Sequence, residues 1–169
     1  MEIIRAEHSG FCFGVKKAVS KAFEEADRQR GGHRLLTCGQ IIHNRQVTEK
    51  LEAKGVQTIL SLEEADEGDT VIVRSHGEPE EFYKEAERRN IHLIDTTCPF
   101  VAKIHDLVKE ASEKSRQVII IGNPEHPEVT ATNGWCGYCA HILQDKADAT
   151  EYAAVYDATK GEPVVVCQT

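Results

Sequence analysis

Cysteine and histidine residues in this sequence occupy positions from which they could bind metals and anions. Cys12 and Cys98 each stand just before a helical pattern, where unpaired N–H groups stabilise a thiolate, the form that binds metals or attacks. His43, His76 and His126 each follow a short apolar run, and imidazole donors at helix N-termini suit a phosphate group. A free cysteine is often a small buried residue and a lone histidine is usually on the surface, so it is their shared placement that predicts a site.

Glu128 and Thr169 are candidates for proton transfer at the same place. Glu128 follows His126 by two residues, in a loop punctuated by proline. Such a carboxylate is usually solvated, but near a metal cluster or a phosphate its pKa can rise toward neutrality and make it a proton donor. Thr169 follows the last predicted strand and, taken alone, is a weak candidate.

The segment Trp135-Cys136-Gly137-Tyr138-Cys139 offers a different chemistry, thiol–disulfide exchange. In a thioredoxin-type site the Cys-x-x-Cys pair follows a strand and opens a helix. Here the pair follows a predicted helix, and no good helix begins after Cys139, so the context does not match. Cys38 and Cys167 end apolar strands, and we expect both to lie in the core. A thiol–disulfide oxidoreductase and a non-catalytic binding module remain the alternatives.

The composition is that of a globular chain in a reducing compartment. The sequence has 169 residues, of which 40% are hydrophobic and 28% charged, with a net charge of −8. The acidic balance argues against a nucleic-acid surface, and no apolar run approaches the roughly 20 residues that span a membrane. No secretory signal is evident at the N-terminus, and six cysteines in such a chain favour metal or redox use, so we expect a cytoplasmic protein.

Strands alternate with helices along the sequence. This order predicts an α/β fold with parallel or mixed sheets flanked by helices. The predicted strands are residues 2–6, 34–38, 56–60, 70–73, 91–94, 117–121 and 162–167. The stretch 131–151 fits no clear period. We expect a first strand and Cys12 turn over 1–13, a first α/β unit over 14–97 and a second, incomplete unit over 98–169.

The candidate residues follow the carboxyl ends of the predicted strands, which is where open α/β sheets bind ligands. A faint internal repeat supports this placement. The sequence from Cys12 resembles the sequence from Cys98, and Gly39-x-x-x-His43 resembles Gly122-x-x-x-His126. Two copies of such a unit would place both cysteines near one axis with the histidines around it.

Five sequence blocks, in order and at matching spacing, resemble the 4-hydroxy-3-methylbut-2-enyl diphosphate reductase family, also called IspH or LytB. The blocks are Gly10-Phe11-Cys12-Phe13-Gly14-Val15, Gly39-Gln40-Ile41-Ile42-His43-Asn44, Arg74-Ser75-His76-Gly77, Asp95-Thr96-Thr97-Cys98-Pro99 and His126-Pro127-Glu128-Val129. The resemblance runs from residue 1 to residue 169. It implies three pseudo-repeated α/β units, of which this sequence matches two.

The resemblance implies an oxygen-sensitive iron–sulfur oxidoreductase of the non-mevalonate pathway of isoprene biosynthesis. Such an enzyme removes the allylic hydroxyl of its substrate with two electrons and protons, and gives isopentenyl and dimethylallyl diphosphates. Cys12 and Cys98 would be metal ligands of a 4Fe–4S cluster, and an electron donor such as ferredoxin or flavodoxin would be a partner.

The resemblance also assigns roles to the remaining candidates. His43 and His76 would bind the diphosphate, and His126 would join the hydrogen-bond network around the substrate. Glu128 would relay a proton to the departing hydroxyl, and Thr169 would contact that hydroxyl through the same network. His126 and Thr169 thus count as both substrate-binding and catalytic residues.

The family pattern includes a third cysteine ligand, in a third unit that also supplies Ser and Asn groups for the diphosphate. Cys136, Cys139 and Cys167 do not occupy the position of that third ligand. We therefore expect this sequence to be an N-terminal portion of such an enzyme, with the segment 1–13 packing against the third unit.

Overall fold

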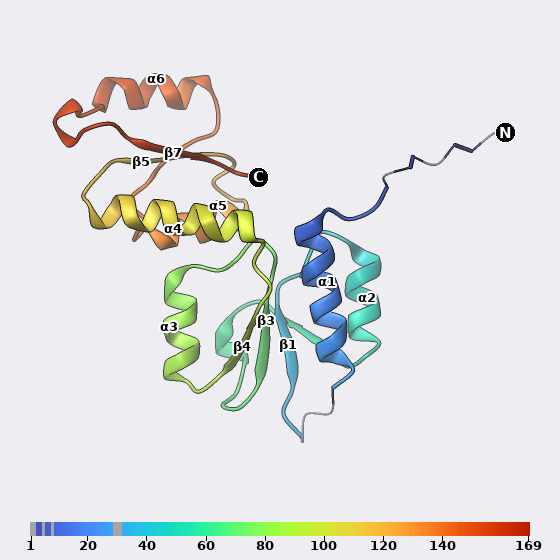
Figure 1. Cartoon of the computed structure of the whole chain (residues 1–169). Coiled ribbons are helices and arrows are strands. Elements are labelled where there is room, and N and C mark those ends of the chain that lie inside the picture. The colour runs from blue at the N-terminus through green and yellow to red at the C-terminus, as the bar shows by residue number, and fades with distance from the viewer. Residues whose placement is uncertain (1–2, 5, 8, 29–31) are drawn as a thin grey trace.

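Two parallel β-sheets, each flanked by helices, make up the protein (Figure 1). The computed structural model describes residues 3–4, 6–7, 9–28 and 32–169. The elements, in chain order, are α1 (Phe13–Ala26), β1 (Leu35–Cys38), α2 (Arg45–Glu52), β2 (Gln57–Ile59), the 3-10 helix η1 (Leu62–Glu64), β3 (Thr70–Val73), α3 (Glu80–Arg88), β4 (His92–Asp95), α4 (Pro99–Glu113), β5 (Val118–Ile121), α5 (Pro127–Trp135), β6 (His141–Leu143), α6 (Lys146–Val155), the 3-10 helix η2 (Ala158–Lys160) and β7 (Val164–Cys167). The predicted α/β class is confirmed.

The first sheet, sheet A, has the strand order β2-β1-β3-β4, and all its pairs are parallel. Its central strands β1 and β3 are buried along their whole length, which is why they appear in the sequence as unbroken runs. Successive side chains point to opposite faces. Leu35 and Ile72 therefore pack under α1 and α2, whereas Leu36 and Val71 pack under α3.

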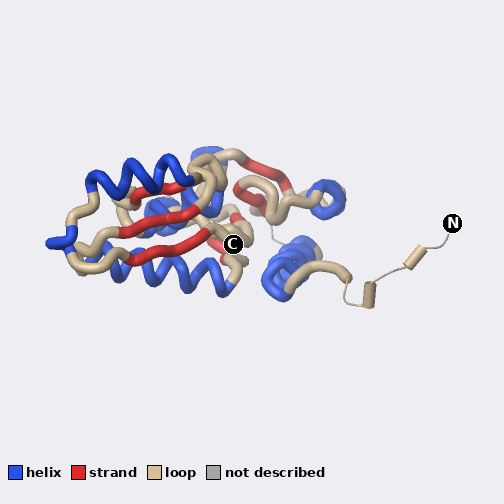
Figure 2. Tube along the Cα trace, turned by 90° about the horizontal axis from the view of Figure 1, so that it is seen from above, coloured by secondary structure: helices blue, strands red, loops and turns tan. Residues whose placement is uncertain are grey.

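The second sheet, sheet B, has the order β6-β5-β7 and is also parallel. Helices α4 and α5 cover one face, where Val108 and Val129 pack against Ile120 and Val166. Helix α6 lies on the opposite side and buries none of its residues (Figure 1). Figure 2 shows the C-terminal end of the chain in the middle of the molecule.

Each sheet contains a point where the chain reverses its direction of winding. In sheet A the chain passes from β1 to β2 on one side and returns to place β3 on the other side of β1. In sheet B, β6 and β7 lie on opposite sides of β5 in the same way. Ligands of open α/β sheets bind in the crevice that such a reversal leaves at the carboxyl ends of the strands. The segments after β1, β3, β5 and β7 hold His43, His76, His126 and Thr169.

Three sequence predictions need correction. Of the predicted strand 2–6, Glu2 and Arg5 lie outside the described residues, and Ile3, Ile4 and Ala6 form no strand because no described strand pairs with them. The Cys12 turn is shorter than predicted, because α1 already begins at Phe13. Cys167 is exposed rather than in the core, since it faces outward from the edge strand β7.

The stretch that showed no period, residues 131–151, contains the end of α5, strand β6 and the first half of α6. The division into units at residues 13, 97 and 169 stays a prediction, and the two sheets lie on either side of residue 97. Within the described residues, no helix is long and apolar enough to cross a membrane.

Candidate active site

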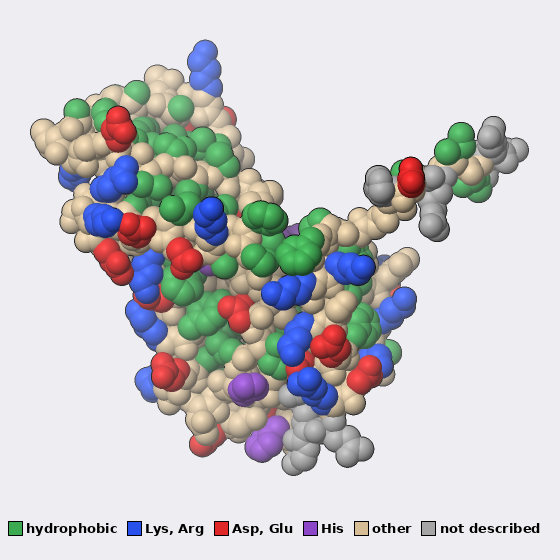
Figure 3. Space-filling view, in the orientation of Figure 1, with side chains coloured by type: hydrophobic (Ala, Val, Ile, Leu, Met, Phe, Trp, Pro, Cys, Tyr) green, Lys and Arg blue, Asp and Glu red, His purple; other side chains and the backbone are tan. Residues whose placement is uncertain are grey.

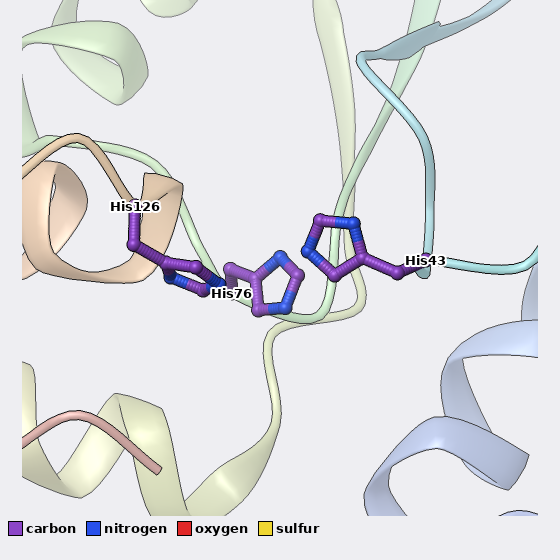
Figure 4. A group of neighbouring side chains, drawn as sticks. All are labelled: His43, His76 and His126. Atoms are coloured by element: carbon purple, nitrogen blue, oxygen red, sulfur yellow. The ribbon is translucent and has the colours of Figure 1, made fainter. Parts of the chain in front are cut away.

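Three histidines from three different loops meet between the two sheets (Figure 4). The ring centroids of His43 and His76 are 4.9 Å apart, those of His76 and His126 are 5.2 Å apart, and those of His43 and His126 are 5.7 Å apart. One nitrogen from each ring lies within 4.8 Å of the other two. The structure therefore brings together residues separated by up to 83 positions in the sequence.

Backbone hydrogen bonds fix two of these loops to each other. The Ser75 N–H donates to the Ile41 carbonyl at 3.2 Å, and the Ser75 hydroxyl donates to the same oxygen at 3.3 Å. The Ser75 carbonyl in turn accepts from the Cys98 N–H at 2.9 Å. The segments carrying His43, His76 and Cys98 are thus joined at one buried residue, Ser75.

His76 is the most perturbed member of the triangle. Burial, followed by the neighbouring His43, His126 and Arg74, lowers the pKa of His76 from 6.5 to about 4. Its Nδ1 atom is buried and has no hydrogen-bond partner within the described part of the chain. At neutral pH His76 is therefore an uncharged ring with unused hydrogen-bonding capacity.

His126 caps helix α5 and this fixes where its proton lies. Its Nδ1 accepts from the Glu128 N–H at 3.2 Å. A neutral imidazole that accepts at Nδ1 carries its hydrogen on Nε2, so the rest of the ring acts as a donor. Three imidazoles at this spacing could also hold a divalent metal ion, but a metal on Nε2 would move the proton to Nδ1 and break the bond to Glu128. The donor set fits an anion better than a metal ion.

Glu128, which is buried, and Thr169, which is exposed, form a hydrogen-bonded pair beside His126. The Thr169 N–H donates to Glu128 Oε1 at 2.6 Å, and the Thr169 hydroxyl donates to Oε2 at 2.9 Å. Glu128 is only 3% exposed, although it lies in the first turn of α5. The pair joins the segment after β7 to the segment after β5, and it leaves the lone pairs of the Thr169 oxygen available to a ligand.

Cys12 and Cys98 are the N-caps of α1 and α4, and neither side chain makes a capping hydrogen bond. The two helix N-termini lie next to each other (Figure 1). A Cβ placed on Gly14 would lie 2.6 Å from the Cys98 sulfur, so only glycine leaves room there. Gly14 lies inside α1, where the absence of a side chain allows this close approach.

Cys12 is exposed and Cys98 is half-buried, and both are free thiols. The aromatic side chains next to them, Phe13 and Phe100, are exposed by more than 60%. Hydrophobic side chains gather on the surface over the starts of α1 and α4 (Figure 3). Two accessible sulfurs at paired helix N-termini fit thiolate ligands of a metal cluster.

The Cys136–Cys139 pair lacks the properties of a redox-active dithiol. Cys136 lies at the C-terminal end of α5, is 2% exposed and donates to the Asn133 carbonyl. Burial, followed by the neighbouring Cys139, raises the pKa of the Cys136 thiol to about 11. A nucleophilic cysteine needs a lowered pKa at a helix N-terminus, so the geometry opposes thiol–disulfide exchange here.

Three residues that surround the His76 turn had no predicted role. Arg74 forms an ion pair with Glu78, at 2.7 Å between Nε and Oε1, across the turn. His105 is 3% exposed, and its ring would collide with a Cβ on Gly77. The position of His105 on the same helical stripe as Val101 and Val108 is a signal that could have identified it as buried.

The profile of the LytB protein family matches residues 3–169. The 4-hydroxy-3-methylbut-2-enyl diphosphate reductase of Alkaliphilus oremlandii is 45% identical over 148 residues, which cover 88% of this chain and 52% of that protein. The protein of the same name from Geotalea daltonii is 44% identical over 169 residues, which cover 100% of this chain and 57% of that protein. The chain thus spans about half the length of these curated relatives.

Solved structures agree with the curated relatives. That of (E)-4-hydroxy-3-methyl-but-2-enyl diphosphate reductase, the terminal enzyme of the non-mevalonate pathway, matches with a TM-score of 0.80 at 37% identity, over 99% of this chain and 58% of that one. That of the Plasmodium falciparum reductase matches with a TM-score of 0.86 at 28% identity, over 95% of this chain and 49% of that one. The resemblance carried by the five sequence blocks is confirmed, and the chain belongs to the LytB protein family.

Proposed function

We propose that this chain provides the diphosphate-binding and proton-donating part of a reductase that converts 4-hydroxy-3-methylbut-2-enyl diphosphate to isopentenyl and dimethylallyl diphosphates. The observation that supports the proposal most strongly is the convergence of His43, His76 and His126 at the carboxyl edges of both sheets. The names of the curated relatives and solved structures supply the substrate.

The diphosphate group is the part of the substrate that the histidine triangle would bind. Each neutral imidazole offers one N–H, and His126 has its donor fixed at Nε2 by the bond to Glu128. His43 and His126 also stand at the starts of α2 and α5, whose N-termini favour negative charge. A bound diphosphate would in turn stabilise the protonated form of His76 and raise its pKa.

The allylic hydroxyl is the part of the substrate that Thr169 and Glu128 would serve. The Thr169 hydroxyl donates its hydrogen to Glu128, so its oxygen can accept from the substrate hydroxyl. When Glu128 is protonated, this bond would reverse: the Glu128 O–H would donate to the Thr169 oxygen, and the Thr169 hydroxyl would pass its own hydrogen to the departing oxygen, which leaves as water. Burial of Glu128 keeps bulk water from competing for its proton.

Cys12 and Cys98 would hold a 4Fe–4S cluster as two of its ligands. When bound, such a cluster would act as a Lewis acid and would pass on, one at a time, the two electrons that the donor supplies for cleavage of the C–O bond. The third cysteine, the ferredoxin or flavodoxin donor, and the cytoplasmic location stay predictions. The third unit is also a prediction. The exposed Phe13 and Phe100 beside the cysteines offer an apolar surface for it to contact.

Titration with inorganic pyrophosphate and with the substrate, followed by calorimetry, tests the proposal. We expect His43→Asn to weaken binding of both ligands by about 10- to 100-fold, because one hydrogen bond to a charged group is lost. His92→Asn, an exposed histidine on strand β4, is the matched control and should bind like the parent. A chain that binds neither ligand, or binding that is equal in both variants, contradicts the proposed site.

A further inference from the structure

The distance between His76 and His126 depends on how two separate units meet. His76 follows strand β3 of sheet A, whereas His126 begins helix α5 beside sheet B. No strand pairing connects the two sheets in the described chain. Contacts between the units, which include side-chain contacts besides the backbone hydrogen bond from Cys98 to Ser75, therefore set the spacing of these two rings.

Trp135, the last residue of α5, makes several contacts with elements of both units. Its indole N–H donates to the Glu78 carbonyl at 2.9 Å, two residues beyond His76. Its ring stacks on His105, with centroids 5.5 Å apart and planes 18° apart. It also contacts the Tyr83 ring at 5.6 Å between centroids, and Lys109 Nζ lies 5.3 Å from the ring centroid. One side chain therefore touches helices and loops of both units.

The surroundings leave this contact little freedom to shift. A Cβ on Gly134 would lie 2.4 Å from Pro79 Cβ, and a Cβ on Gly77 would lie 2.5 Å from the His105 ring. The turn that carries His76 is closed by a hydrogen bond from the Gly77 N–H to the Arg74 carbonyl and by the Arg74–Glu78 ion pair. The Glu78 carbonyl is thus a fixed acceptor for Trp135.

We infer that Trp135 is a positioning residue, which sets the spacing between His76 and His126 through its hydrogen bond to the Glu78 carbonyl. Helix α5 has nine residues, so it is a rigid rod of about 13 Å with His126 at one end and Trp135 at the other. A displacement at the Trp135 end moves His126, and with it Glu128. The inference rests on the proposed function only in assuming that these rings bind a diphosphate.

Ring-to-ring cross-peaks in the NMR spectrum of the isotopically labelled chain measure the spacing without any ligand. In Trp135→Phe, which keeps an aromatic ring but loses the N–H, we expect the His76–His126 cross-peak to weaken. The His43–His76 cross-peak should stay, because both rings belong to the unit of sheet A and Ser75 joins their loops. Tyr152→Phe is the matched control, since it removes a ring-borne donor that bonds within the other unit, to Gln117 at 3.3 Å.

Binding gives a second measurement. We expect the affinity of Trp135→Phe for inorganic pyrophosphate to fall about tenfold, because small misplacements of binding groups are costly. If the parent binds no pyrophosphate, the proposed function fails, and the cross-peaks still decide the role of Trp135. An unchanged His76–His126 cross-peak overturns the inference. If Trp135→Phe does not fold, Lys109→Met serves as the second variant. It removes the ion pair to Glu80 and the cation over the indole ring, and the inference again requires the His76–His126 cross-peak to weaken.

Discussion

At the scale of single residues, Glu128 shows how the surroundings of a side chain in the fold decide its chemistry. The carboxylate belongs to the first turn of a helix, where it would ordinarily be solvated, yet it is buried and receives two hydrogen bonds from Thr169. Glu125, three residues earlier in the same loop, is exposed. The proposed proton donor and a solvated carboxylate are thus close in sequence but lie in different environments.

This contrast allows a matched pair of substitutions. Glu128→Gln keeps the shape of the side chain and can still accept the Thr169 N–H, but it has no proton to deliver. We expect the reconstituted reductase that contains this chain to lose turnover by about 100-fold or more, with little change in pyrophosphate affinity. Glu125→Gln should leave turnover unchanged. Equal turnover in the two variants would exclude Glu128 as the donor.

At the scale of elements, the helix N-termini bring the proposed ligands together. Helices α1 and α4 begin one residue after Cys12 and Cys98, and they approach each other at Gly14. The internal repeat noticed in the sequence corresponds to these two helices, each followed by a parallel strand and then by a loop with a histidine. The repeat predicted that both cysteines lie near one axis, but the close contact between Gly14 and Cys98 could not be predicted, because it depends on how the two units pack.

Gly14→Ala tests this approach. Alanine favours a helix, so the free energy of unfolding should change by no more than about 1 kcal/mol, but the new methyl group must displace the Cys98 sulfur. After anaerobic reconstitution we expect the brown iron–sulfur absorption to be reduced, as in Cys12→Ser and Cys98→Ser. Ser20→Ala, at an exposed position of the same helix, controls for helix propensity. Full colour in Gly14→Ala and in both cysteine variants would show that the cluster lies elsewhere.

The elements also show what the sequence could predict. The buried strands β1, β3 and β5 are short apolar runs rich in branched residues, and their positions were predicted within one residue. Helix α6 was missed because it buries no residue and so has no apolar stripe. Its capping box, formed by Asp145 and Asp148, is a local signal that could have revealed it.

At the scale of the whole molecule, two buried histidines couple folding to pH. Burial lowers the pKa of His105 to about 4, against the opposing effect of Asp95 and Asp106, and His76 has a similar value. The unfolded chain therefore binds more protons between about pH 4 and pH 6.5, so the free energy of unfolding falls as the pH falls through this range. Glu78, whose pKa is raised by burial, acts in the opposite direction.

A comparison of variants separates the contribution of His105 to this pH dependence from those of His76 and Glu78. His105→Phe keeps a ring against Trp135 and removes one titrating group. We expect its free energy of unfolding, relative to the parent, to be about 2 kcal/mol higher at pH 5 than at pH 7.5. Urea denaturation at the two pH values measures the difference, and His92→Phe should show none. A pH-independent effect would mean that the pKa of His105 is the same in the folded and the unfolded chain.

The sequence alone could predict only part of the candidate site. The sequence predicted which groups would meet, because each follows the carboxyl end of a parallel strand, but it did not show that these strands belong to two separate sheets. It did not predict Ser75, Trp135 or His105, because their importance comes from contacts between loops and between units.

The hydrogen bonds at Ser75 are made mainly by backbone atoms. The donors are the N–H groups of residues 75 and 98, and the acceptors are the carbonyls of residues 41 and 75. Every amino acid except proline can supply such a donor. Evolution can therefore exchange side chains at these positions while the loops that carry His43, His76 and Cys98 remain joined, so that sequence divergence at position 75 tells little about whether the linkage has been inherited.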